Sequence, residues 1–332
     1  QYSLADRGGE LFILTSADGA IDFKVVTAPL ASPERANWRD LIPHREGIYV
    51  LDVELYAGHM VRLERANALP AIIIRDLKTG EEHAIAFDEA AYSLDTMGSY
   101  EFETTNLRFS YSSMTTPSEV YDYDMAARTR VMRKRQEIPS GHNPADYVTT
   151  RIMAPSHDGA LVPVSILHRK DLVRDGSAPL LLYGYGSYGM AMPASFSANR
   201  LSLVDRGFVY AIAHIRGGAD KGWGWYLDGK REKKTNSFDD FAASARALIE
   251  AKYTSAKRIV GHGGSAGGML MGAVANRSGE LFAGIVAEVP FVDVLNTMLD
   301  DTLPLTPPEW PEWGNPIESE ADFRTILSYS PY

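Results

Sequence analysis

Cysteine is absent from this sequence of 332 residues. A disulfide framework, a thiolate metal site and a thiol nucleophile are therefore excluded, and we expect neither a metal nor a cofactor. The sequence also lacks a hydrophobic run of membrane-spanning length and a stretch that resembles a signal peptide, which favours a cytoplasmic location. Basic residues are in deficit, with 33 Lys and Arg against 43 Asp and Glu. Neither nucleic acid nor an anionic membrane is thus the expected main partner.

The remaining composition is typical of a globular chain with a large core. Hydrophobic residues make up 45% of the sequence and charged residues 23%, and the length favours two domains. Near Ile138 the sequence pattern changes from repeated strand-like runs to alternating strands and helices. We therefore predict an all-β domain over residues 1–137 and an α/β domain over residues 138–332.

The first domain carries a repeat of strand-like runs. Residues 10–15, 59–64 and 106–111 are each followed by a second run, at 23–27, 71–76 and 119–124. Leu11, Met60 and Leu107 are separated by 49 and 47 residues, a period typical of propeller blades, although an irregular β-sandwich could show it by coincidence. About three blades fit here and a closed propeller needs at least four, so we expect further blades before Gln1.

The second domain alternates strands and helices. A hairpin is predicted to turn at Asp158-Gly159, and near-continuous apolar runs at 179–183 and 208–215 predict strands buried on both faces. Residues 284–289 predict a further strand. Between them, residues 237–252 predict an amphipathic helix with Ser237 as its N-cap. This order predicts a doubly wound, mostly parallel sheet of the α/β-hydrolase kind, in which ligands bind at the carboxyl ends of the strands.

One corner of this sheet has the pattern of a nucleophile elbow. The apolar run at 258–261 meets Gly263-Gly264-Ser265-Ala266-Gly267-Gly268, after which an apolar helix is predicted. A serine on such a strained strand-to-helix turn needs neighbours with almost no side chain. Ser265 is therefore the candidate nucleophile, and the N–H of Ala266 is a candidate donor to an oxyanion.

Other functions remain open for the same glycines. Gly261, Gly263 and Ala266 also fit a loose dinucleotide fingerprint, with Glu288 as a possible ribose ligand, so a dinucleotide-binding oxidoreductase is one alternative. A purely structural turn in a non-catalytic, propeller-type binding module is another. A second glycine motif at residues 184–189 contains two tyrosines, and the hydroxyl of Tyr185 is a candidate second oxyanion donor, with simple packing as its alternative.

Several motifs together resemble the prolyl oligopeptidase family of serine peptidases. They are Tyr183-Gly184-Tyr185-Gly186, Arg216-Gly217-Gly218 and the Ser265 motif, in the order propeller then hydrolase. Within that family, Val289-Pro290-Phe291-Val292-Asp293, the segment at 309–316 and Ser328-Tyr329-Ser330-Pro331-Tyr332 are similar to oligopeptidase B. The resemblance implies a peptidase that cuts short peptides after arginine or lysine, with the propeller limiting access to the site.

The resemblance also implies roles for individual residues. Ser265 would be the nucleophile, and the Ala266 N–H and Tyr185 hydroxyl would form the oxyanion hole. Because a cationic side chain that leaves water needs a carboxylate, Glu309 would be the primary specificity acid. Phe291 would form a wall of that pocket. Pro311 stands where relatives commonly carry a second acid, and Glu312 is its nearest substitute.

Histidine is missing where the resemblance places the catalytic base. In α/β-hydrolases the triad order along the chain is Ser, then Asp or Glu, then His, yet all eight histidines precede Ser265, the last being His262. We therefore expect the acid and base beyond Tyr332, and parts of the same protein at both ends as partners of this chain. By this expectation the 332-residue chain alone is not a competent peptidase.

Overall fold

The computed structural model describes residues 2–332, and the chain forms two compact units. Unit 1 consists of Gln1–Gly141 with the short segments Pro193–Phe196 and Lys221–Gly224. Unit 2 consists of His142–Met192, Ser197–Asp220 and Trp225–Tyr332. Among residues 2–332, no helix is long and apolar enough to cross a membrane.

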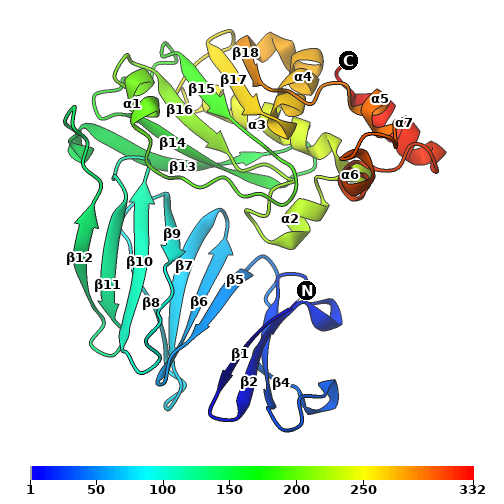
Figure 1. Cartoon of the computed structure of the whole chain (residues 1–332). Coiled ribbons are helices and arrows are strands. Elements are labelled where there is room, and N and C mark those ends of the chain that lie inside the picture. The colour runs from blue at the N-terminus through cyan, green and yellow to red at the C-terminus, as the bar shows by residue number, and fades with distance from the viewer. Residues whose placement is uncertain (1) are drawn as a thin grey trace. The chain divides into compact units, whose positions relative to one another are not determined.

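Unit 1 is built from three antiparallel sheets of four strands, and in each sheet the strands follow the order of the chain (Figure 1). The first sheet contains β1 (Tyr2–Arg7), β2 (Glu10–Thr15), β3 (Lys24–Pro29) and β4 (Arg39–Ile42). The second contains β5 (Tyr49–Leu55), β6 (His59–Ala66), β7 (Leu69–Asp76) and β8 (Glu82–Ala84). The third contains β9 (Tyr92–Thr96), β10 (Asn106–Ser113), β11 (Glu119–Asp124) and β12 (Thr129–Arg135).

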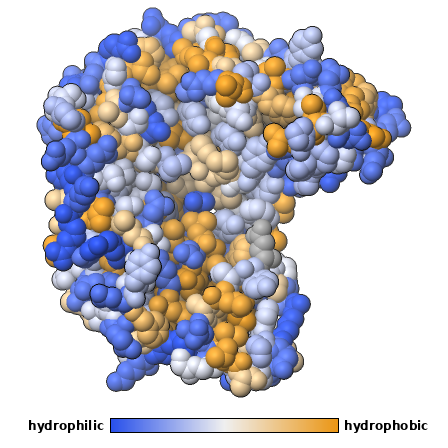
Figure 2. Space-filling model, in the orientation of Figure 1, coloured by the Kyte–Doolittle hydropathy of each residue, from blue (hydrophilic) through white to orange (hydrophobic). Residues whose placement is uncertain are grey.

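These sheets confirm the predicted propeller blades. The leading runs of the repeat are β2, β6 and β10, and each occupies the second position of its sheet. Strand alternation places apolar side chains in the core, as in β10, where Leu107 and Phe109 are buried and Arg108 is exposed. The outer strand β12 is exposed throughout, and Figure 2 shows that edge as mostly hydrophilic. Its arginines discourage edge-to-edge pairing with another chain.

Unit 2 is organised around a six-stranded sheet in the order β13-β14-β16-β15-β17-β18. Its strands are β13 (Tyr147–Pro155), β14 (Leu161–Arg169), β15 (Leu180–Tyr183), β16 (Val209–Ala213), β17 (Ile259–Gly264) and β18 (Phe282–Glu288). The β13–β14 hairpin is antiparallel and joins β16, whereas β16, β15, β17 and β18 run parallel. The predicted doubly wound sheet with an antiparallel edge is therefore confirmed.

Seven α-helices lie in the described part of the chain (Figure 1). They are α1 (Ala198–Val204), α2 (Trp223–Leu227), α3 (Thr235–Glu250), α4 (Ala266–Ser278), α5 (Val294–Met298), α6 (Thr306–Trp313) and α7 (Glu320–Tyr329). Helices α3 and α4 pack on each other and on the sheet. The predicted apolar face of α3 is buried, with Phe238, Phe241 and Leu248 at most 1% exposed. These side chains belong to one apolar core that also includes the central strands.

The predicted N-cap of α3 is wrong. The helix begins at Thr235, two residues before Ser237, and the residue at its N-cap position is Lys234. Ser237 is buried inside the first turn and donates its hydroxyl proton to the carbonyl of Arg216, at 2.8 Å. Burial explains the difference, because a carbonyl removed from water needs a donor more than an exposed helix end needs a cap.

A buried ion pair fixes the segment that follows β16. Arg216 is 3% exposed and donates through Nε and Nη2 to the two carboxylate oxygens of Asp240, at 2.9 and 2.7 Å. The backbone N–H of Arg216 donates to the same carboxylate, and Nη1 reaches Asp158 in the turn between β13 and β14. The Arg216-Gly217-Gly218 motif is thus anchored to α3 and to the hairpin at once.

We predict that Asp240→Ala will lower the free energy of unfolding by roughly 3 to 5 kcal/mol, because it leaves the Arg216 guanidinium buried without its main counter-ion. The measurement is urea unfolding of the full-length protein, followed by a probe in unit 2. Asp239→Ala is the matched control, since Asp239 is the neighbouring residue and pairs with Arg277 at the surface; its expected effect is below about 1 kcal/mol. Equal effects of the two substitutions would contradict the assignment.

Candidate active site

The strand order of unit 2 brings two loops together. Strand β15 lies between β16 and β17, so the chain leaves β15 in one direction and returns on its other side as β17. Such a reversal opens a crevice at the carboxyl ends of the strands, where ligands bind in sheets of this kind. Tyr183 pairs in register with His262, and the N–H of Gly184 donates to the His262 carbonyl at 3.1 Å. The Tyr185 loop (residues 184–189) therefore begins beside the turn that carries Ser265.

Ser265 occupies a strained backbone conformation at this turn. Its φ of 56° and ψ of −118° lie outside the regions that residues with side chains commonly adopt. The turn is held by the Ser265 N–H, which donates to the Glu288 carbonyl of β18 at 2.9 Å. The Ser265 carbonyl accepts from the N–H groups of Gly268, Met269 and Phe291. The side chain is exposed, so the strained backbone presents the hydroxyl to solvent.

The glycines around Ser265 are required by close backbone contacts. A Cβ atom on Gly263 would overlap the carbonyl of Gly267, and one on Gly268 would lie 2.6 Å from the Cα of Pro290. The nucleophile-elbow prediction needed small neighbours for this reason. The space beside Gly261 is filled by Ile285 and Met271, which a Cβ would approach at 2.9 and 3.1 Å. The pyrophosphate of a dinucleotide would need that space to be empty, so the structure does not favour the dinucleotide fingerprint at Gly261.

The two predicted oxyanion donors adjoin Ser265. Ala266 is the first residue of α4, and the helix itself supplies no acceptor for its N–H. Burial raises the pKa of Tyr185, while the neighbouring Ser265 side chain opposes that rise. Tyr185 therefore keeps its proton at neutral pH and can donate it. The two predicted oxyanion donors and the predicted nucleophile lie together.

Trp313 connects the predicted specificity acid to this turn. It is fully buried at the end of α6, and its indole N–H donates to Glu309 Oε2 at 2.8 Å. Its ring lies 5.5 Å from that of Phe291, whose own N–H donates to the Ser265 carbonyl. Tyr188 packs on the other side of Trp313, with ring centroids 5.7 Å apart, and donates its hydroxyl to the same Glu309 oxygen at 2.7 Å.

These contacts form a closed circuit around the site. From Ser265 it passes through Phe291 and Trp313 to Glu309, and it returns through Tyr188 and Tyr185, whose ring centroids are 6.3 Å apart. Five of the six predicted site residues, namely Ser265, Ala266, Tyr185, Phe291 and Glu309, belong to this circuit or adjoin it. Sequence reasoning did not predict Tyr188 and Trp313 as site residues. The only signal for them in the sequence is that they are aromatic residues close to predicted site residues.

Glu312 is buried and supports the circuit through the backbone of Tyr188. It is 4% exposed, and its two carboxylate oxygens already accept hydrogen bonds: Oε1 from the N–H of Tyr188 at 2.9 Å and Oε2 from the hydroxyl of Tyr226 at 2.7 Å. Lys230 lies 4.0 Å from Oε2. Glu312 therefore holds the Tyr188 backbone from below, and a ligand would have to displace internal partners to reach its carboxylate.

In the part of the chain that the structure describes, no histidine hydrogen-bonds the Ser265 hydroxyl. His262, although three residues away in sequence, packs edge-on against Tyr183 and places Nε2 3.4 Å from the Glu288 carboxylate. His168 contacts the carbonyl of its neighbour Arg169, and His157 lies near Asp239 on α3.

His214 belongs to a different Ser-His-Asp arrangement in the core. Its Nε2 lies 2.8 Å from Ser165 Oγ and its Nδ1 lies 2.9 Å from Asp220 Oδ1. These are the contacts of a hydrolase triad, yet the three residues are at most 2% exposed. No substrate carbonyl can reach Ser165 there. The arrangement instead ties β14 and β16 to the segment that follows Arg216-Gly217-Gly218.

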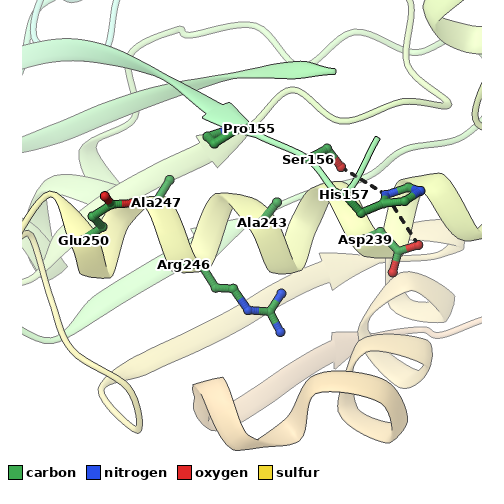
Figure 3. A pocket seen from close by; sticks show the side chains of 8 residues that line it. All are labelled: Pro155, Ser156, His157, Asp239, Ala243, Arg246, Ala247 and Glu250. Carbon is green, nitrogen blue, oxygen red and sulfur yellow. Dashed lines mark hydrogen bonds and ion pairs between the residues drawn. The ribbon is translucent and has the colours of Figure 1, made fainter. Parts of the chain in front are cut away.

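A separate hollow lies along the outer side of α3 (Figure 3). It has a volume of about 260 Å³ and is lined by Pro155, Ser156, His157, Asp239, Ala243, Arg246, Ala247 and Glu250. Figure 3 shows His157 and Asp239 turned toward each other at one end. Two of its charged groups have protein partners, since Asp239 accepts from Arg277 and Arg246 reaches Glu280. None of the predicted site residues lines it.

Comparison with known proteins decides the family. A model described as "Prolyl oligopeptidase family" matches residues 194–332, and one described as "Prolyl oligopeptidase, N-terminal beta-propeller domain" matches residues 1–136. The chain belongs to the prolyl oligopeptidase family. The resemblance seen in the sequence motifs is thereby confirmed, and the family is one of serine peptidases with a propeller and an α/β-hydrolase domain.

Relatives within the prolyl oligopeptidase family match the chain over its whole length. It is 46% identical to the dipeptidyl aminopeptidase BI of Pseudoxanthomonas mexicana and 36% identical to the protease 2 of Moraxella lacunata, covering 100% of this chain and 46% and 47% of those proteins. The solved oligopeptidase B structures of Leishmania major and Trypanosoma brucei superpose with TM-scores of 0.90 and 0.92 at 36% identity, covering 47% and 48% of their chains. The chain thus spans about half the length of the relatives it matches. The oxidoreductase alternative finds no support among them.

We predict that a fluorophosphonate probe will label the full-length protein at Ser265 and not at Ser165, because Ser265 is exposed beside the two predicted oxyanion donors whereas Ser165 is buried. Labelling should be abolished by Ser265→Ala and unchanged by Ser165→Ala. Mass spectrometry of the labelled peptides identifies the modified serine. Label on Ser165, or label that survives Ser265→Ala, would show that the elbow does not carry the reactive hydroxyl.

Proposed function

We propose that the full-length protein hydrolyses short peptides after arginine or lysine, through an acyl-enzyme formed on Ser265. The observation that carries the proposal is the circuit of contacts that joins the exposed Ser265 hydroxyl to the Glu309 carboxylate. The circuit links the candidate nucleophile and the candidate oxyanion donor Tyr185 to a carboxylate that would bind a cationic side chain, and the second candidate donor, Ala266, directly follows Ser265 in the chain. The dipeptidyl aminopeptidase and oligopeptidase names of the relatives agree with peptide hydrolysis.

The proposed chemistry starts with attack by Ser265 Oγ on the carbonyl carbon before the scissile bond. A general base takes the hydroxyl proton and then gives it to the leaving amine as the C–N bond breaks. Water, activated by the same base, then hydrolyses the ester and restores the serine. The resemblance implies a histidine as this base, oriented by an aspartate, and their identities stay predictions.

Stabilisation of the tetrahedral intermediate would fall to Ala266 and Tyr185. The negative charge develops on the former carbonyl oxygen, and fixed donors stabilise it without having to reorganise during the reaction. The raised pKa of Tyr185, caused by its burial, keeps the phenol in the donating form. This ionisation state is the one that the proposed role requires.

Recognition of the basic side chain would rest on Glu309. Both of its protein donors, Tyr188 and Trp313, bind Oε2. This fixes the carboxylate and leaves Oε1 to accept from a guanidinium or ammonium group. Phe291 and Trp313 provide apolar surface for the methylene part of the substrate side chain. Glu312 remains the second predicted acid, and its internal partners favour a supporting role for it.

We predict that Tyr185→Phe in the full-length protein will lower kcat with little change in KM. One hydroxyl donor to an oxyanion is worth about 3 kcal/mol in the transition state, so the fall should be on the order of a hundredfold. Steady-state kinetics with an arginyl peptide provide the measurement. A rise in KM alone would instead identify the hydroxyl as a contact to the bound substrate.

We also predict that Glu309→Gln will reduce kcat/KM for arginyl substrates by at least about a hundredfold, because breaking a desolvated ion pair on one side costs roughly 3 to 5 kcal/mol. The amide keeps the size and the acceptor oxygen but removes the charge. Arginine should lose at least as much as lysine, since the guanidinium fork depends more on a carboxylate partner.

The control for Glu309→Gln is a citrulline substrate, which is a neutral isostere of arginine and should be cut at nearly the same rate by both proteins. Comparing the two specificity constants separates loss of the charge from a disturbed pocket. Equal losses for both substrates would point to a structural role for Glu309 and would move the specificity acid to Glu312.

A further inference from the structure

Lys234 is a buried cation that contacts the loop carrying the proposed oxyanion donor Tyr185. It is 1% exposed and its ammonium donates to the carbonyl of Gly186 at 2.5 Å, the hydroxyl of Ser187 at 2.8 Å and the carbonyl of Gly229 at 3.3 Å. The nitrogen also lies 5.1 Å from the ring centre of Trp313. Its three acceptors are therefore neutral oxygens, and its fourth contact is an aromatic face.

Placing an ammonium group there is costly for folding. Burial without a contacting carboxylate disfavours the charged form, and it lowers the pKa of Lys234 to about 8, with the nearby Glu312 opposing the shift. The side chain still carries its charge at neutral pH. An apolar residue of similar size would give a more stable core, so stability alone does not account for a lysine at this position.

The bonds of Lys234 are concentrated on the Tyr185 loop. Gly186 and Ser187 lie between the two tyrosines of the circuit, Tyr185 and Tyr188. The Gly186 backbone has a φ of 75°, and a Cβ atom there would lie 2.7 Å from Ile215. The peptide that Lys234 holds is thus one residue from the proposed oxyanion donor, in a conformation that a free loop would leave readily.

We propose that Lys234 is a positioning residue that directs the Tyr185 hydroxyl toward Ser265 by fixing the Gly186–Ser187 peptide from below. The inference deepens the proposed function and rests on it. Lys234 itself touches neither nucleophile nor oxyanion in this arrangement. Its effect on the reaction should therefore pass entirely through Tyr185.

The decisive experiment is a double-mutant cycle in the full-length protein with an arginyl peptide as substrate. Lys234→Met removes the ammonium and keeps the side-chain length, and it should lower kcat by about 10- to 100-fold with little change in KM, as expected when a catalytic group is displaced by about 1 Å. The double variant Lys234→Met/Tyr185→Phe should be no more than about threefold slower than Tyr185→Phe alone, because coupled residues are not additive. Losses that multiply would overturn the proposal.

Lys233→Met is the matched control. Lys233 is the adjacent lysine, lies at the surface and pairs with Asp228 at 2.6 Å, so its removal should leave kcat unchanged. If Lys234→Met does not fold, Ser187→Ala takes its place in the same cycle, since it removes one acceptor of the ammonium and leaves the lysine. A Ser187→Ala variant with unchanged kcat, or one whose loss multiplies with that of Tyr185→Phe, overturns the proposal.

The pattern of results separates this inference from the function on which it rests. A wild-type protein without peptidase activity, or one whose activity survives Ser265→Ala, overturns both. Activity that depends on Ser265, combined with a Lys234→Met variant that keeps its kcat, overturns only the role of Lys234. Activity that depends on Ser265 but is insensitive to Tyr185→Phe also overturns the role of Lys234, because no hydroxyl remains for it to position.

Discussion

The close approach of two backbones at the ends of β15 and β17 is the constraint on which the site depends. A Cβ on Gly267 would lie 2.9 Å from the Gly184 carbonyl, so the two segments are in contact through main-chain atoms. Because this contact holds the turn in place, Ser265 keeps its unusual φ and its side chain stays exposed. The same contact carries Tyr185 to the serine. The rest of the site is assembled outward from these few peptide groups.

Aromatic residues form most of this outer assembly. Tyr185, Tyr188, Phe291 and Trp313 have few rotatable bonds, and three of them carry a polar group at one end. They can therefore pack in the core and still aim a donor at Ser265 or Glu309. Two carboxylates and one ammonium lie among them, each held by fixed donors or acceptors. The result is a polar site whose geometry is set by rigid apolar rings.

The fold could be predicted well from the sequence because its signals are local. The period of β2, β6 and β10 and the apolar runs of β15 and β16 reflect burial that repeats along the chain. The strained turn at Ser265 could also be predicted, since such a turn restricts its own neighbours to small residues. The hydrogen-bond partner of Ser237 and the proposed role of Lys234 could not be predicted from the sequence, because both depend on carbonyl groups that only folding brings close. Glu312 shows the same limit: its sequence context suggests a pocket, whereas its burial and donors come from Tyr188 and Tyr226.

Hydrolases normally combine the hydrogen-bond geometry of a triad with access for water and substrate. The buried arrangement of Ser165, His214 and Asp220 has the geometry without the access. Its interatomic distances match those of a working triad, so side-chain geometry alone would select Ser165 and not the proposed nucleophile Ser265. Hydrolysis also consumes a water molecule and moves a peptide in and out, and the closed interior admits neither. In this molecule access to solvent and substrate, rather than the quality of the hydrogen bonds, distinguishes the proposed nucleophile Ser265 from the buried Ser165.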